Sequence, residues 1–146
     1  MWLEINVIND KFFLLVVYRA ESNMDESFWQ LMQDMIDEVQ SKNNAKVMII
    51  GDLNANPHTR HGQLLNEFAF VNSLKQHITK PTRITNNSET ILDQILTNFS
   101  SLVKHVGIEA PISSSDHCLV EISCSFKIMK KKAYVRRMWD LCKSKL

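Results

Sequence analysis

Polar and apolar residues alternate at the start of the chain. The alternation covers residues 2–8 and is typical of a strand with one face buried. The apolar side chains expected on that face are Leu3, Ile5 and Val7. Residues 9–11 favour a turn, and the apolar run of residues 12–18 follows. The pattern therefore predicts a β-hairpin.

The period of the pattern then changes to that of a helix. Apolar residues recur every three or four positions between residues 28 and 39, which predicts an amphipathic helix. Residues 47–50 are wholly apolar and are followed by Gly51, as in a strand that is covered on both faces. A second helix is predicted for residues 63–71, where the apolar side chains share a face.

Later segments again have the character of strands. Residues 79–83 are expected to be extended, because Pro81 keeps the preceding residue out of the helical region. Apolar or alternating runs predict further strands at residues 91–96, 103–108 and 118–126. This mixture of helices and strands predicts an α/β (α+β) domain with mixed sheets.

Three aspartates stand where apolar runs meet polar segments. Asp52 follows residues 47–50, Asp93 interrupts a later apolar run, and Asp116 precedes the last predicted strand. A charge beside apolar side chains is costly unless it is paired. Carboxylates suit Mg²⁺, which prefers oxygen ligands and assists phosphodiester hydrolysis. Each acid taken singly is explained as a turn or a cap, but the ordered set indicates hydrolytic chemistry.

His117 is the natural partner of one of these acids. Neighbouring side chains on a regular strand point to opposite faces, so Asp116 is poorly placed to orient the imidazole. Asp93 comes from a different predicted strand. We therefore expect Asp93 to orient His117.

Size and charge narrow the picture further. The chain has 146 residues, 45% of them hydrophobic, which suits one domain with a substantial core. It has neither a signal peptide nor an apolar run of the roughly 20 residues that a membrane-spanning helix requires, so we expect a soluble intracellular protein, nuclear or cytoplasmic. Residues 127–146 carry eight basic side chains and one acid. This basic end predicts either a nucleic-acid contact or a solvated tail.

Five short motifs follow one another along the chain. They are Tyr18-Arg19, Gly51-Asp52-Leu53-Asn54, Pro81-Thr82-Arg83, Leu92-Asp93-Gln94-Ile95 and Ser115-Asp116-His117. This ordered set resembles the endonuclease/exonuclease/phosphatase superfamily. The first and third motifs are most similar to the endonuclease domain of non-LTR (LINE-type) retrotransposons, which is itself similar to the abasic-site DNA endonucleases. The family has two prolines where this chain has Ala20 and Glu21.

The resemblance implies a site that cleaves DNA with Mg²⁺ or Mn²⁺. Asp52 would position or deprotonate the attacking water. Asn54 would help to bind the phosphate, and Tyr18 would contact the same group. A tyrosine that closes an apolar strand is otherwise typical of a core residue.

The resemblance also assigns the remaining motif residues. His117, oriented by Asp93, would stabilise charge in the transition state, and Asp116 would lie beside the metal. Thr82 and Arg83 would touch the DNA backbone, since arginine forms paired hydrogen bonds to phosphate. An ordinary surface arginine is the alternative for Arg83.

The resemblance covers residues 2–126 and implies part of a four-layer α/β/β/α sandwich. The family's N-terminal strands, which carry the glutamate that is its principal metal ligand, have no counterpart in the sequence. We therefore expect an N-terminally truncated domain with an exposed sheet edge, weak metal binding and little or no nuclease activity. Residues 127–146 resemble the start of the linker that leads to a reverse transcriptase domain in longer relatives.

Two other functions remain open at this point. One is a non-catalytic nucleic-acid-binding remnant. The other is hydrolysis of small phosphates or lipids by a phosphatase or sphingomyelinase-like member of the superfamily. The retrotransposon-like motifs and the basic end favour DNA as the partner.

Overall fold

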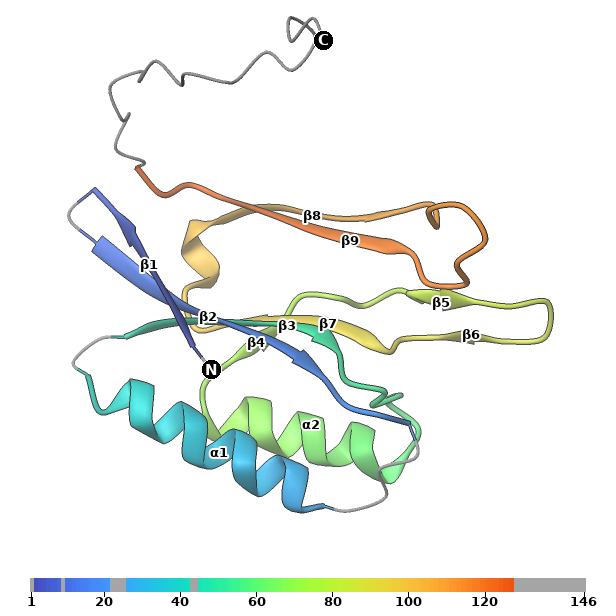
Figure 1. Cartoon of the computed structure of the whole chain (residues 1–146), viewed down its shortest axis with the longest axis horizontal. Helices are drawn as coiled ribbons and strands as arrows, with labels where there is room; N and C mark the ends of the chain where they lie inside the picture. The colour runs from blue at the N-terminus through green and yellow to red at the C-terminus, as the bar shows by residue number, and fades with distance from the viewer. Residues whose placement is uncertain (1, 9, 22–25, 43–44, 128–146) are drawn as a thin grey trace, which may run out of the picture.

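A five-stranded sheet is the centre of the molecule (Figure 1). The computed structural model describes residues 2–8, 10–21, 26–42 and 45–127. Only β2 and β3 are parallel neighbours, and the other pairs are antiparallel. In sheet order the strands are β1 (Leu3–Val7), β2 (Asp10–Tyr18), β3 (Lys46–Asp52), β7 (Asp93–Thr97) and β4 (Lys75–Gln76).

Two helices, α1 (Ser27–Gln40) and α2 (Arg60–Val71), cover one face of this sheet (Figure 1). Alternate side chains of the strands point toward the helices and are excluded from water, because the side chains of a strand alternate between its two faces. The principal buried residues between the helices and the sheet are Phe13, Leu15, Val47, Ile49 and Leu96 from the strands and Trp29, Met32, Ile36, Leu65 and Phe68 from the helices. Neither helix among the described residues is long and apolar enough to cross a membrane.

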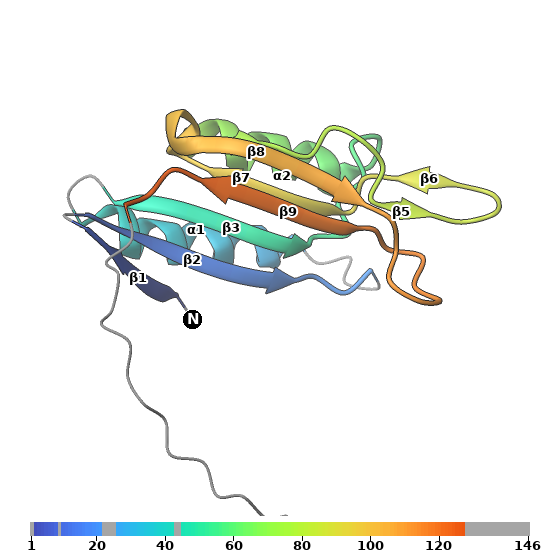
Figure 2. The ribbon, with the colours of Figure 1, turned by 90° about the horizontal axis from the view of Figure 1, so that it is seen from above.

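The opposite face of the sheet carries a hairpin of β8 (Val103–Glu109) and β9 (Leu119–Cys124) (Figure 2). The short 3-10 helix η1 (Ser100–Leu102) leads into it. Phe12 of the sheet stacks on Phe126 with 4.8 Å between the ring centroids, and Phe99 packs against both rings. The described residues therefore form three layers: helices, central sheet and hairpin.

A second, small hairpin projects from the end of the sheet at which β3 ends (Figure 1). It consists of β5 (Arg83–Ile84) and β6 (Glu89–Thr90). An isolated bridge between Arg83 and His117 joins it to the loop that precedes β9. The segments that carry the sequence motifs are thus brought to one end of the molecule.

Most long elements confirm the sequence predictions, and two details differ. The mixed α/β architecture, the first hairpin and the helix over residues 28–39 are confirmed. The second helix begins at Arg60, because Thr59 caps it by accepting a hydrogen bond from the Gly62 N–H. The two-residue strands β4, β5 and β6 were not predicted.

The expectation for the first strand is wrong in one respect. Leu3 is 48% exposed, whereas Ile5 and Val7 on the same face are half-buried, so the predicted burial is wrong at the start of the strand. Trp2, from the other face, packs on the helical core and donates from Nε1 to the carbonyl oxygen of Met35 at 3.0 Å. The β8–β9 hairpin explains the difference, because β1 lies to one side of it and this face of the strand has less cover (Figure 2). Apart from Lys127, the basic segment of residues 127–146 lies outside the described residues.

Candidate active site

Two aspartates face each other across neighbouring strands. Asp52 ends β3, and its partner in the antiparallel register of β7 is Asp93. Directly opposed residues of an antiparallel pair point to the same face. Ile49 and Leu96 point toward the helices, so the alternation of side chains places both carboxylates on the opposite face, beside the β8–β9 hairpin.

His117 completes the group from the loop before β9. Its Nδ1 lies 2.9 Å from Asp93 Oδ2. One ligand atom each from Asp52, Asp93 and His117 lies within 4.8 Å of the others. The structure therefore brings together three of the residues that the sequence singled out, and it places Asp93 where it can orient the imidazole.

The environment of Asp52 favours a carboxyl group that accepts a proton. Burial raises its pKa above the ordinary value, and the charge of Asp93 raises it further. The Asn54 N–H, 3.0 Å from Asp52 Oδ1, and the charges of His117 and Arg19 oppose this shift. A general base is most effective when its pKa is closer to neutral pH than that of a free carboxylate.

Gly51 lets β3 carry Asp52 close to β2. Its φ of +147° lies where L side chains are strained, and an added Cβ would lie 1.8 Å from the carbonyl oxygen of Val17. The glycine in the second motif is therefore explained by close approach of two backbones. It fixes the strand end from which Asp52 projects.

Arg19 belongs to the first sequence motif, and the structure places it in the site. Its side chain is 2% exposed. Nε donates to the carbonyl oxygen of Leu53 at 2.7 Å, and Nη2 donates to that of Asn54. Asn54 Nδ2 in turn donates to the Arg19 carbonyl oxygen at 2.8 Å. Arg19 thus holds the loop that follows Asp52, and its position directly after an apolar strand was the signal available in the sequence.

Asn54 has a left-handed backbone, with φ of +44°. Asparagine tolerates this conformation better than most residues, which suits a tight turn after a strand. The turn brings the Asn54 amide and the Asp52 carboxylate together. Asp52, assigned to the water, and Asn54, assigned to the phosphate, therefore lie in one tight turn.

Thr82 is fully buried, so the expected contact of its side chain with the DNA backbone is wrong. Its Oγ1 accepts hydrogen bonds from the N–H groups of Leu92 and Asp93 at 3.1 and 3.0 Å. Thr82 therefore fixes the backbone of Asp93, a role that depends on a contact across eleven residues of chain and has no local signal.

Asp116 and Arg83 form an ion pair, with 2.7 Å between Arg83 Nε and Asp116 Oδ2. The hydrogen bond from Arg83 holds the pKa of Asp116 below its ordinary value. Asp116 lies outside the group formed by Asp52, Asp93 and His117. Its assignment as a metal neighbour stays a prediction, and in this structure its carboxylate is neutralised by arginine.

Tyr18 ends β2 beside Asp52 in the parallel register. Phe13 and Leu15 point toward the helices, so alternation places Tyr18 on the face that carries the two aspartates. Its side chain is 70% exposed. Tyr18 is therefore available to a ligand and is not the core residue that an apolar strand end would suggest.

The donor set fits a divalent cation. Asp52 and Asp93 offer carboxylate oxygens, which suit Mg²⁺ and Mn²⁺. His117 Nδ1 is taken by Asp93, so the imidazole is better suited to hydrogen bonding than to binding a hard cation.

Comparison with solved structures identifies the fold. The endonuclease domain of TRAS1, a telomere-specific non-LTR retrotransposon, superposes with a TM-score of 0.73 at 16% identity and covers 88% of this chain. An endonuclease/exonuclease/phosphatase family protein from Leptotrichia buccalis C-1013-b superposes with a TM-score of 0.61, also at 16% identity, and covers 86%. The fold is therefore that of these endonuclease/exonuclease/phosphatase family structures. This chain spans 62% and 53% of those two structures.

The sequence also matches a family model. This model, described as endonuclease-reverse transcriptase, matches residues 12–121. The chain belongs to this endonuclease-reverse transcriptase family. A search of curated proteins finds no match.

Proposed function

We propose that this chain supplies the catalytic face of a Mg²⁺-dependent DNA endonuclease of the non-LTR retrotransposon type. The proposal rests on the Asp52–Asp93–His117 group, whose ligand atoms lie within 4.8 Å of one another. The family and the fold support a hydrolase.

Asp52 is the proposed general base. Its raised pKa allows it to take a proton from the water that attacks phosphorus. Asn54, whose loop is held by Arg19, is the proposed donor of a hydrogen bond from its side-chain amide to the phosphate. Tyr18 offers a hydroxyl on the same face.

His117 is proposed to stabilise the negative charge that develops on the phosphoryl group. An ionised carboxylate accepts hydrogen bonds but cannot donate them, so the contact with Asp93 Oδ2 keeps a proton on Nδ1. Nε2 is then the ring atom that can donate to a phosphoryl oxygen when the ring is protonated. The bond from phosphorus to the leaving oxygen breaks as the bond from the water oxygen forms.

A divalent cation held by carboxylate oxygens of Asp93 or Asp116 would neutralise phosphoryl charge and stabilise the leaving oxygen, while Asp52 accepts the proton of the water. The remaining residues bind and orient. Arg83 lies at the edge of the site, although Asp116 occupies its Nε. Thr82 acts only through the backbone of Asp93.

A substrate comparison tests this proposal. Purified protein is incubated with supercoiled plasmid DNA and, separately, with p-nitrophenyl phosphate, each with Mg²⁺ or with EDTA. We expect slow, Mg²⁺-dependent nicking of the plasmid and no release of nitrophenol. Preferential hydrolysis of the small phosphoester would indicate a phosphatase-like enzyme, and DNA binding without cleavage at any metal concentration would indicate a non-catalytic module.

A further inference from the structure

A cleft of about 520 Å³ lies directly beside the proposed catalytic group. Asn54, which bonds to Asp52, lines it, and so does Arg83, which pairs with Asp116. The cleft runs from these residues to the first turn of α2, where Arg60 and His61 line it. It is therefore continuous with the site but is built largely from residues that the chemistry does not use.

His61 presents a fixed hydrogen-bond donor in this cleft. The Trp29 indole N–H can only donate, and it lies 3.1 Å from His61 Nδ1, so Nδ1 must be the acceptor. The neutral ring then carries its proton on Nε2. Among the described residues Nε2 has no hydrogen-bond partner. His61 is 8% exposed, and burial lowers its pKa, which keeps it in this neutral form.

The first turn of α2 adds backbone donors beside His61. Thr59 caps the Gly62 N–H through its side chain, whereas helix geometry leaves the N–H groups of Arg60 and His61 without acceptors inside the helix. The positive end of the helix dipole lies at the same place. Such a helix start favours a phosphate group.

The turn is also held rigidly against the loop that carries Asn54. An added Cβ at Gly62 would lie 2.1 Å from the carbonyl oxygen of Asn56, so the helix and the loop are in close contact. A ligand in the cleft would therefore be held at a fixed position relative to Asp52.

Charge at the cleft favours an anion only modestly. Arg19, Arg60 and Arg83 line it, and so do Glu21 and Glu26. Arg60 is the exposed guanidinium, and Glu26 pairs with it at 2.8 Å. Glu26 takes its Nε and Nη2 atoms, which leaves other N–H donors of the guanidinium for a ligand.

We propose that this cleft binds a second backbone phosphate of the nucleic-acid strand, close to the phosphate that is cut at Asp52. His61 Nε2–H, the first amides of α2 and the Arg60 guanidinium are its donors. The inference rests on the proposed function for the nature of the strand. It adds a binding site that none of the sequence motifs contains.

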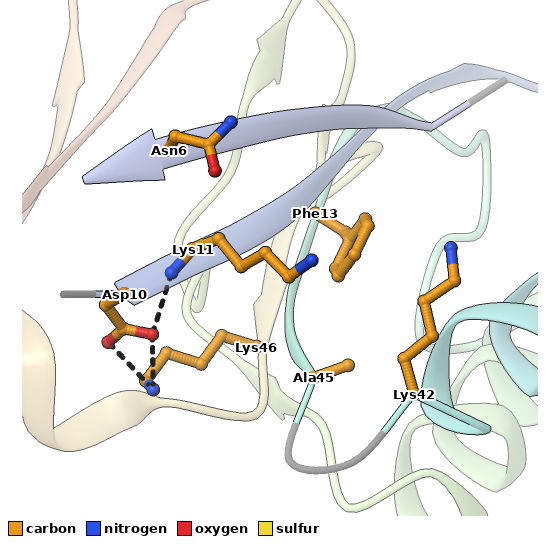
Figure 3. A pocket seen from close by; sticks show the side chains of 7 residues that line it. All are labelled: Asn6, Asp10, Lys11, Phe13, Lys42, Ala45 and Lys46. Carbon is orange, nitrogen blue, oxygen red and sulfur yellow. Dashed lines mark hydrogen bonds and ion pairs between the residues drawn. The ribbon is translucent and has the colours of Figure 1, made fainter. Parts of the chain in front are cut away.

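A second basic pocket is a weaker candidate (Figure 3). It lies at the other end of β3, where the strand begins, roughly 20 Å from Asp52 at the usual rise per residue. Carboxylates already engage two of its lysines, since Asp10 pairs with Lys46 at 2.9 Å and Glu4 pairs with Lys11 at 3.2 Å. The remaining ammonium, that of Lys42, lies 4.9 Å from the centre of the Phe13 ring. The three lysines of this pocket therefore already have partners and do not call for a bound anion.

Binding to DNA without metal tests the proposal. Fluorescence anisotropy with a labelled DNA duplex in EDTA is measured for the wild type, Arg60→Gln and Lys75→Gln, which each remove one exposed positive charge. We expect Arg60→Gln to raise Kd about 3- to 10-fold and to reduce the salt slope by about 1, as for the loss of one phosphate contact. We expect Lys75→Gln, in β4 beyond the last turn of α2, to change Kd less than 2-fold. Equal effects of the two variants would overturn the proposal.

Arg60→Gln also breaks the ion pair with Glu26, and Glu26→Gln breaks the same pair while keeping the Arg60 charge. Because Glu26→Gln releases Arg60 for the ligand, we expect DNA binding to tighten, and weaker binding would overturn the proposal. Titration with inorganic phosphate, followed by ¹H–¹⁵N NMR, should shift the signals of the Arg60 and His61 amides and of the Trp29 indole. Shifts confined to Lys11 and Lys42 would place the anion in the other pocket and would also overturn it.

The result is independent of whether cleavage occurs. Binding that depends on Arg60 without any nicking would support the phosphate-binding cleft and refute the proposed nuclease. Nicking together with DNA binding that is insensitive to Arg60→Gln would support the nuclease and refute the cleft.

Discussion

Two buried polar side chains hold the backbone that carries the candidate catalytic acids. Arg19 donates to the loop after Asp52, and Thr82 accepts from the N–H of Asp93. Both side chains act on main-chain atoms, so the site depends on residues that need not touch substrate. Their substitution should therefore affect stability and activity together.

Thr82→Val is the direct test of this support. It leaves the N–H groups of Leu92 and Asp93 without an acceptor in a buried place, which should lower the free energy of unfolding by about 2 kcal/mol or more. Thr82→Ser keeps Oγ1 and should lose only about 1 kcal/mol, for the missing methyl group. Urea unfolding measures both. Equal losses would show that the hydroxyl does not hold this backbone.

His77 makes stability depend on pH. Burial lowers its pKa from the ordinary value of 6.5, and the charge of Lys75 adds to this. The unfolded chain therefore takes up a proton more readily than the folded protein, so the free energy of unfolding should fall between pH 7 and pH 5. His77→Gln can keep the 2.8 Å contact with Thr97 Oγ1 and does not titrate, so its loss should be smaller.

Urea unfolding of the wild type and His77→Gln at pH 7 and pH 5 measures the difference. Some loss should remain in the variant, because burial also lowers the pKa of His61. A wild type that gains stability toward pH 5, or a variant with the same loss as the wild type, would contradict this assignment.

At the scale of elements, the contact between β2 and β3 decides where Asp52 lies. Gly51→Ala would force its Cβ against the Val17 carbonyl oxygen, 1.8 Å away, from a backbone with φ of +147°. We expect a loss of about 2 kcal/mol or more in the free energy of unfolding. Gly107→Ala is a matched control in β8, where the new Cβ meets mainly the flexible side chain of Glu121.

Thermal or urea unfolding of the two variants gives the comparison. Gly107→Ala should stay within about 1 kcal/mol of the wild type. A Gly51→Ala protein as stable as this control would mean that the two strands do not approach as closely as described.

The sequence predicted long elements better than short ones. The helix over residues 28–39 and the strand around residues 47–50 have enough apolar positions to set a period, and the structure confirms both. The strands β4, β5 and β6 have two residues each, so no period can be read from them. Their pairing depends on partners elsewhere in the chain.

The same distinction holds for the site. Asp52, Asp93 and His117 stand in recognisable motifs, and the structure brings them together. The supporting roles of Arg19 and Thr82 come from side-chain contacts with distant main-chain atoms, which local patterns do not encode. The cleft at the start of α2 likewise needs the packing of His61 on Trp29.

At the scale of the whole molecule, the sheet is unevenly covered. In Figure 2, β1 and β2 lie to one side of the β8–β9 hairpin. Leu3 and Val16 are 48% and 64% exposed there, on the face away from the helices. Exposed apolar surface beside an edge strand favours association with another surface.

We therefore expect the isolated chain to associate as its concentration rises. Val16→Lys should reduce this association, because it places a charge in the middle of the exposed surface. Sedimentation velocity over a range of concentrations measures it, with Lys104→Gln as a control for a change of charge elsewhere. A wild type that stays monomeric at all concentrations would contradict the expectation.

The central claim is that Asp52, Asp93 and His117 form a metal-assisted hydrolytic site. Its most direct test is the rate of plasmid nicking with Mg²⁺ for the wild type, Asp52→Asn and the control Asp34→Asn, an exposed acid on α1. We expect slow nicking that requires the metal, falls about 100-fold or more in Asp52→Asn and is unchanged in Asp34→Asn. Nicking that persists in Asp52→Asn, or that proceeds equally well in EDTA, would contradict the account.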